Sequence, residues 1–159
     1  MPPERSNTPT TTGASHRNVF DPEMKLMRGR NADGTFQSPF SPYKWGDAYT
    51  EGNAWHYTWS VFHDVGGLID LMGARKSFAQ MFDSMFVVRR QLLRIRIHEI
   101  TEMQVANMGN YAHGNQPAQH MIYLYDYCGQ PHKAQWWVRE VMDRLYSAKP
   151  DGYCGDEDN

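Results

Sequence analysis

The chain contains 159 residues, which is enough for one ordinary domain, and its 40% hydrophobic content allows a packed core. The net charge of -2 gives no basic surface for nucleic acid, so we expect no nucleic-acid partner. No apolar run approaches the roughly 18 residues that cross a bilayer. The N-terminus also lacks the apolar core of a signal peptide, so we expect neither a membrane partner nor a visible secretion signal.

The N-terminal part of the chain carries few helical signals. Residues 1–16 are rich in Pro, Thr, Ser and Asn and poor in apolar residues, which predicts a disordered N-terminal segment. Residues 24–34 are expected to form a short hairpin or loop that closes with a turn at Asp33-Gly34.

Helical periodicity begins at about residue 53. Trp55, Trp59 and Phe62 recur at i, i+4 and i+7 and are expected to share one face. A second short helix is expected to end at Gly73, because glycine tolerates the left-handed conformation that often follows a helix. The clearest amphipathic helix carries its apolar residues at i, i+3, i+4, i+7 and i+8: Phe78, Met81, Phe82, Met85 and Phe86.

Two further helices are expected in the C-terminal part, after residues 89–100, whose apolar spacing fits either a strand or a helix. Each begins near a proline, Pro117 or Pro131, because proline suits the first helical turn. The first is expected to stop at Gly129, and the second to end before Pro150. The buried stripe of the second is expected to comprise Trp137, Val138, Val141, Met142 and Leu145. Paired helices joined by loops indicate an all-α fold class.

A lone carboxylate, Glu51, lies between glycine and aromatic residues rather than among other charges. Burial among rings disfavours the charged form of a carboxyl group and raises its pKa. Aromatic faces also suit the apolar side of a sugar ring, so the stretch indicates a glycosidase-like acid. The alternative is an acidic residue in the first turn of a helix, where the helix dipole favours it.

Polar residues in the later loops are the other candidates for chemistry. His98-Glu99 and the stretch from His113 to His120 suit hydrogen bonds to sugar hydroxyls, although loop and cap polarity explains these residues equally well. The spacing of His113 and His120 does not fit a zinc site. Asp156 and Asp158 alternate in an expected loop, so both can point into one site. Such a pair can hold a divalent cation or activate water, and a solvated acidic terminus is the alternative.

Seven stretches of the chain read as motifs: residues 31–34, 45–59, 63–64, 111–117, 123–125, 129–131 and 150–159. Together they resemble glycoside hydrolase family 92, whose members are calcium-dependent, inverting, exo-acting α-mannosidases. The resemblance implies that residues 17–159 form part of the catalytic α/α barrel, a barrel of helical hairpins that is incomplete in this chain. It also implies an N-terminal β-sandwich domain in the parent enzyme, and we expect none of that domain among these 159 residues.

The same resemblance implies roles for individual residues. Glu51 would be the general acid, and Asp156 and Asp158 the pair that activates water. The implied Ca²⁺ contacts are Asn115, Gln116 and Asp158. The implied contacts to a mannose-containing glycan, an N-glycan or mannan with α-1,2 linkages, are Trp55, His98, Glu99 and His113.

Two segments, residues 1–16 and 87–96, depart from the family pattern. We expect the isolated chain to have little or no hydrolase activity, because an incomplete barrel leaves apolar helix faces without partners. The alternative, from a different functional class, is that the chain is a non-catalytic helical remnant or a module that binds glycan or calcium weakly.

Overall fold

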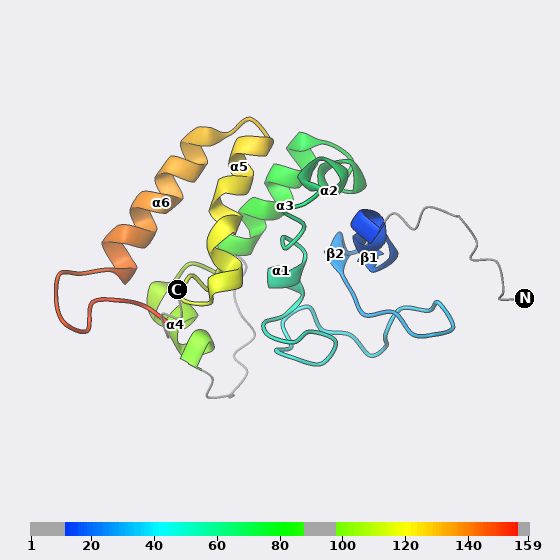
Figure 1. The fold of residues 1–159 in the computed structure, drawn as a ribbon, viewed down its shortest axis with the longest axis horizontal. Coiled ribbons are helices and arrows are strands. Elements are labelled where there is room, and N and C mark those ends of the chain that lie inside the picture. Colours follow the sequence, from blue (N-terminus) through cyan, green and yellow to red (C-terminus); the bar gives the residue numbers. More distant parts are fainter. Residues whose placement is uncertain (1–11, 88–97, 156–159) are drawn as a thin grey trace, which may run out of the picture.

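The computed structural model describes residues 12–87 and 98–155 of the chain, and these residues are mainly helical (Figure 1). The elements in chain order are the 3-10 helix η1 (Thr12–Asn18), strands β1 (Phe20–Asp21) and β2 (Leu26–Met27), helices α1 (Ala54–Tyr57), α2 (Val65–Leu71), α3 (Arg75–Val87) and α4 (His98–Ala106), the 3-10 helix η2 (Gln116–Tyr123), and helices α5 (Leu124–Tyr127) and α6 (Pro131–Leu145). The dominance of helix agrees with the predicted all-α class. Within the described ranges, no helix is long and apolar enough to cross a membrane.

The first described residues correct the prediction for the N-terminal segment. Residues 12–16 belong to η1, although composition predicts disorder for residues 1–16; residues 1–11 lie outside the described ranges. The imidazole of His16 is buried, with Nε2 3.6 Å from Oδ2 of Asp64. Composition does not predict the structure of residues 12–16, because the contact that supports it, between His16 and Asp64, joins residues far apart in the sequence.

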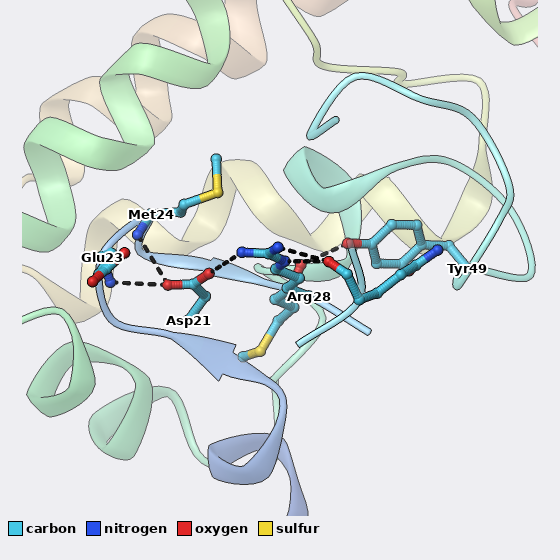
Figure 2. Close-up of polar contacts among 7 residues, drawn as sticks. Asp21, Glu23, Met24, Arg28 and Tyr49 are labelled. Carbon is cyan, nitrogen blue, oxygen red and sulfur yellow. Dashed lines mark hydrogen bonds and ion pairs between the residues drawn. The ribbon is translucent and has the colours of Figure 1, made fainter. Parts of the chain in front are cut away.

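Strands β1 and β2 form an antiparallel hairpin that a buried ion pair supports (Figure 2). The Asp21 carboxylate accepts hydrogen bonds from Nη1 of Arg28 at 2.9 Å and from the backbone N–H groups of Glu23 and Met24 at 3.0 and 3.3 Å. Burial acts to raise the pKa of Asp21, but the hydrogen bonds from Arg28 and from the two N–H groups outweigh it and leave the pKa below its ordinary value. The pair therefore stabilises the hairpin while Asp21 is ionised.

The hairpin also anchors the loop that leads to Glu51. The Arg28 guanidinium donates two hydrogen bonds to the carbonyl of Gln37, at 2.9 and 2.6 Å. The hydroxyl of Tyr49, seen beside this pair in Figure 2, donates to the carbonyl of Met27 at 2.6 Å. A second turn, closed by the bridge between Arg30 and Phe36, confirms the hairpin or loop predicted for residues 24–34.

Helix α1 is much shorter than its apolar spacing predicts. It ends at Tyr57, and the Thr58 hydroxyl donates back to the carbonyl of Ala54 at 2.6 Å. Trp59 is fully buried, but Phe62 is 70% exposed, so the expectation that Phe62 shares the buried face of Trp59 is wrong. The physical reason is that i+7 spacing defines a common face only while the helix continues.

The core lies where α3 crosses the chain after α1 and packs beside α5 and α6 (Figure 1). The Phe82 ring contacts those of Trp59 and Tyr125, with centroids 4.7 and 4.6 Å apart, and Phe86 stacks on Trp137 at 4.0 Å. The amphipathic helix predicted over residues 78–86 is therefore confirmed. Its apolar residues are buried, except Met81, which is half-buried.

A polar clamp ties the same three helices together beside the core. Asp83 of α3 accepts hydrogen bonds from the Tyr125 hydroxyl of α5 at 2.8 Å and from the Lys133 ammonium of α6 at 2.6 and 2.8 Å. Helix α6 ends before Pro150, as predicted, but its buried stripe is narrower than expected. Val141 is buried, whereas Met142 is 53% exposed because no described element covers that side of α6.

Candidate active site

Glu51 lies in a loop that the chain closes tightly just before α1. The N–H of Gly46 donates to the carbonyl of Gly52 at 2.8 Å, and the N–H of Glu51 donates to the Tyr57 hydroxyl at 3.2 Å. Gly52 has a φ of 72°, and a side chain there would also collide with the ring of His56. Glycine at this position therefore lets the loop that carries Glu51 turn directly into α1.

Asn53 and His56 cap the start of α1 reciprocally. The Asn53 side chain accepts from the backbone N–H of Trp55 at 2.9 Å, and Nδ1 of His56 accepts from the backbone N–H of Asn53 at 3.0 Å. The Trp45 ring meets the His56 ring edge to face at 5.4 Å. These contacts fix the first turn of α1 and hence the loop before it.

A pocket of about 360 Å³ opens between this region and the start of η2. One wall carries Glu51, Tyr57 and Phe62, and the opposite wall carries Asn115, Gln116 and His120. The two walls meet where the His120 ring contacts the edge of Phe62 at 5.5 Å and its Nε2 hydrogen-bonds to the carbonyl of Trp59 at 3.0 Å. The structure thus brings three residues predicted from the sequence, Glu51, Asn115 and Gln116, into one cavity.

The side chain of Glu51 is exposed, which corrects the expectation of a carboxyl group buried among aromatic rings. Trp55, which the sequence predicts as a sugar contact, does not lie beside Glu51 in the pocket. Trp55 is only 5% exposed and stacks on Tyr43 in the core, so it is not among the described residues that line the pocket. Glu51 therefore stands at the rim of the cavity, in reach of a solvent-borne substrate.

The second wall supplies oxygen donors of the type that a hard cation prefers. Asn115 is buried at the N-cap of η2, yet its side chain makes no capping hydrogen bond with that helix. Gln116 follows it on the same wall. Amide oxygens are common Ca²⁺ ligands, so both residues fit the ion that the resemblance implies. Among the described residues, no cluster of three or more His, Cys, Asp or Glu side chains is arranged to hold a metal.

His113 lies just outside this pocket and is held by two tyrosines. Its Nδ1 lies 2.7 Å from the hydroxyl of Tyr111, and its Nε2 lies 3.0 Å from the hydroxyl of Tyr146. Burial lowers the pKa of His113, which favours a neutral ring between these partners. The structure therefore gives His113 two protein partners and a place on a neighbouring cavity rather than beside Glu51.

The remaining predicted site residues lie at or beyond the edges of the described ranges. His98 and Glu99 begin α4, which gives this end of residues 89–100 a helical conformation, while residues 88–97 lie outside the description. Asp156 and Asp158 lie outside it as well. The residue before them, Gly155, packs against the backbone of Gly114, so the described chain ends beside the loop that carries Asn115 and Gln116.

Several residues of this cavity carry no signal in the sequence. Tyr57 anchors the Glu51 loop, and Phe62 lines the cavity although its spacing predicts a common face with Trp59. His56, which caps α1, lines the cavity as well. The local pattern from Asn53 to His56 could have indicated a cap. No local pattern reports that η2 lies opposite, because that contact joins segments about sixty residues apart.

We expect the free energy of unfolding to fall at acid pH because of the buried His56. Burial lowers the pKa of His56 to about 4, against a weaker opposing effect of the Asn110 backbone. Below about pH 6.5 the unfolded chain binds a proton that the folded chain excludes, so stability falls as pH drops from 6.5 to 4, by roughly 3 kcal/mol in total. Urea unfolding across this range should show a clearly smaller loss for His56→Gln, since glutamine can still accept from Asn53.

An equal loss in the variant would contradict this assignment. A residual pH dependence is expected in any case, because burial also lowers the pKa of His16 and of His113.

The chain is similar in sequence and in fold to known proteins. The model of the glycosyl hydrolase family 92 catalytic domain matches residues 4–159. The GH92 α-mannosidase BT3965 of Bacteroides thetaiotaomicron, solved with mannoimidazole, is 35% identical with a TM-score of 0.78, and the match covers 90% of this chain and 19% of that one. The GH92 inverting mannosidase BT2199 of the same organism is 51% identical with a TM-score of 0.71, covering 90% and 20%. A comparison with curated protein sequences found no significant match.

Proposed function

Because the chain belongs to glycosyl hydrolase family 92, we propose that it forms one part of the active site of an exo-acting α-mannosidase built on an α/α barrel. The chain spans about one fifth of the length of the solved structures that it matches, so the remainder of the site comes from a larger catalytic domain. The observation that carries the proposal is the single pocket shared by Glu51, Asn115 and Gln116.

In this proposal Glu51 is the general acid. Its exposed carboxyl group stands at the rim of the pocket, where it can give a proton to the departing glycosidic oxygen of a terminal mannoside. Its backbone is pinned by the hydrogen bond to Tyr57, which limits where the carboxyl group can reach. Such positioning matters because proton transfer requires hydrogen-bond distance in the reacting complex.

Asp156 and Asp158 activate the attacking water on the opposite side of the sugar. Inversion needs two carboxyl groups about 6.5–9.5 Å apart, which leaves space for that water. The packing of Gly155 against Gly114 supports this role, because it brings the chain just before Asp156 to the wall opposite Glu51.

Asn115, Gln116 and Asp158 hold Ca²⁺ in the proposed site. Bound by these residues, Ca²⁺ would supply positive charge for contacts with mannosyl hydroxyls and would favour distortion of the sugar ring towards an oxocarbenium-like state. The chain's own residues contribute the acid, the oxygen donors and the shape of the cavity. His98 and Glu99 are proposed to contact the next sugar and to select an α-1,2 linkage in an N-glycan or mannan.

Calcium binding by the 159-residue chain tests this proposal. A ligand present at 100 times its dissociation constant stabilises the folded state by about 2.7 kcal/mol. We therefore expect CaCl₂ to raise the melting temperature, and Asn115→Ala or Asp158→Ala to abolish the shift. Asp143→Ala on the exposed side of α6 is the matched control and should retain it. Absence of a shift in the wild-type chain would favour the non-catalytic remnant.

A further inference from the structure

A carboxylate outside the pocket holds the backbone of the loop that supplies the proposed calcium donors. Glu102 lies on α4, and its Oε1 accepts a hydrogen bond from the backbone N–H of Gly114 at 2.6 Å. Gly114 directly precedes Asn115 and Gln116. A short hydrogen bond from a backbone N–H to an ionised carboxylate is among the stronger protein hydrogen bonds.

The surroundings of Gly114 leave the loop little freedom. A Cβ atom at Gly114 would collide with both the Glu102 carboxylate and the backbone of Gly155. Gly114 is buried, and the N–H of Asn115 donates to the carbonyl of Ala112 at 3.2 Å. The loop is therefore clamped between α4 and the segment at Gly155, with the Glu102 carboxylate as the side-chain part of the clamp.

Oxygen donors must converge on a cation within a few tenths of an ångström, so the backbone that carries them has to be fixed. In metal sites, the groups that orient the ligands affect affinity almost as strongly as the ligands, typically by 10- to 100-fold. We propose that Glu102 is a positioning residue of the active site, which sets the calcium-binding geometry of Asn115 and Gln116 through the Gly114 N–H. This inference rests on the proposed function.

The distinguishing experiment compares Glu102→Ala with Glu102→Gln in the 159-residue chain. The amide oxygen of glutamine can still accept from Gly114, whereas alanine cannot. We expect calcium affinity, measured by titration calorimetry, to fall 10- to 100-fold in Glu102→Ala and to stay within about 3-fold of wild type in Glu102→Gln. Gln104→Ala, an exposed position on the same helix, is the matched control.

The amide proton of Gly114 gives a readout that does not depend on calcium. In ¹H–¹⁵N spectra it should lie downfield and exchange slowly in the wild type and in Glu102→Gln, and lose both properties in Glu102→Ala. Gly114→Ala keeps the carboxylate but displaces the loop, and it should weaken calcium binding as well. This variant guards against a folding defect specific to Glu102→Ala.

Each result decides between the alternatives. Equal calcium affinity in the wild type and in Glu102→Ala would overturn the inference and leave the proposed function standing. An equal loss in Glu102→Gln and Glu102→Ala would also overturn it, because the charge of Glu102 would then matter rather than its contact with Gly114. A wild-type chain that binds no calcium would overturn both, and the Gly114 amide would then report a purely structural contact.

Discussion

Glu51→Gln, introduced into a catalytic domain that carries this chain, should lower kcat for α-1,2-mannobiose by about 10²- to 10⁴-fold, the usual contribution of general acid catalysis. The amide cannot donate a proton to the glycosidic oxygen but keeps the shape of the side chain. The backbone contact with Tyr57 is also unchanged, since it uses the N–H of residue 51. KM should change little, because the rim position of Glu51 contributes mainly to the reacting complex.

The leaving group provides the internal control for this experiment. A mannoside with an activated leaving group, such as 2,4-dinitrophenolate, departs without protonation, so Glu51→Gln should retain most of its activity on that substrate. Steady-state kinetics on the two substrates separates the roles. Full activity on mannobiose would remove Glu51 from the mechanism, and an equal loss on both substrates would indicate a damaged pocket rather than a missing acid.

Phe82→Ala should produce the largest loss of stability, about 3–5 kcal/mol, which is a large part of the stability of an ordinary domain. The Phe82 ring is fully buried and contacts Trp59, Phe78, Phe86 and Tyr125, so it joins α3 to the chain after α1 and to α5. Its removal leaves a cavity that these rings cannot fill without leaving their positions in the core.

Phe62→Ala is the matched control, because it removes the same side chain from a position that is 70% exposed. Its effect on stability should stay within about 0.5 kcal/mol. Chemical unfolding of the two variants under identical conditions tests the contrast. Similar losses would contradict the exposed placement of Phe62 on the pocket wall and would favour the common face with Trp59 that its spacing predicts.

The contrast between Phe82 and Phe62 also shows what sequence patterns can predict in this chain. Over α3, apolar residues recur at helical spacing through the whole helix, so the pattern and the structure agree. After α1, the Thr58 hydroxyl bonds back to Ala54 and the helix stops, and the spacing to Phe62 loses its meaning. Helical spacing of apolar residues predicts a common face only within a segment whose backbone hydrogen bonds form a continuous helix.

Sequence motifs pointed to three residues that line the candidate site, but not to its other members or to its assembly. Glu51, Asn115 and Gln116 belong to recognisable motifs, yet only the folded chain brings them into one cavity. Trp55 was predicted to contact the glycan, but its place in the core could not be inferred from composition. Burial depends on which distant segment covers a side chain, and local sequence carries no record of that segment.

The contact between Gly114 and Gly155 has a consequence for the order in which the molecule forms. The two glycines are about forty residues apart, and η2, α5 and α6 all lie between them. Closing a loop of this length in an unfolded chain costs conformational entropy, and the packing of η2, α5 and α6 on one another shortens the loop that remains to be closed. A ribosome must release the chain as far as Gly155 before the two backbones can meet. The loop that carries Asn115 and Gln116 is therefore expected to acquire its final shape only after residue 155 has been synthesised.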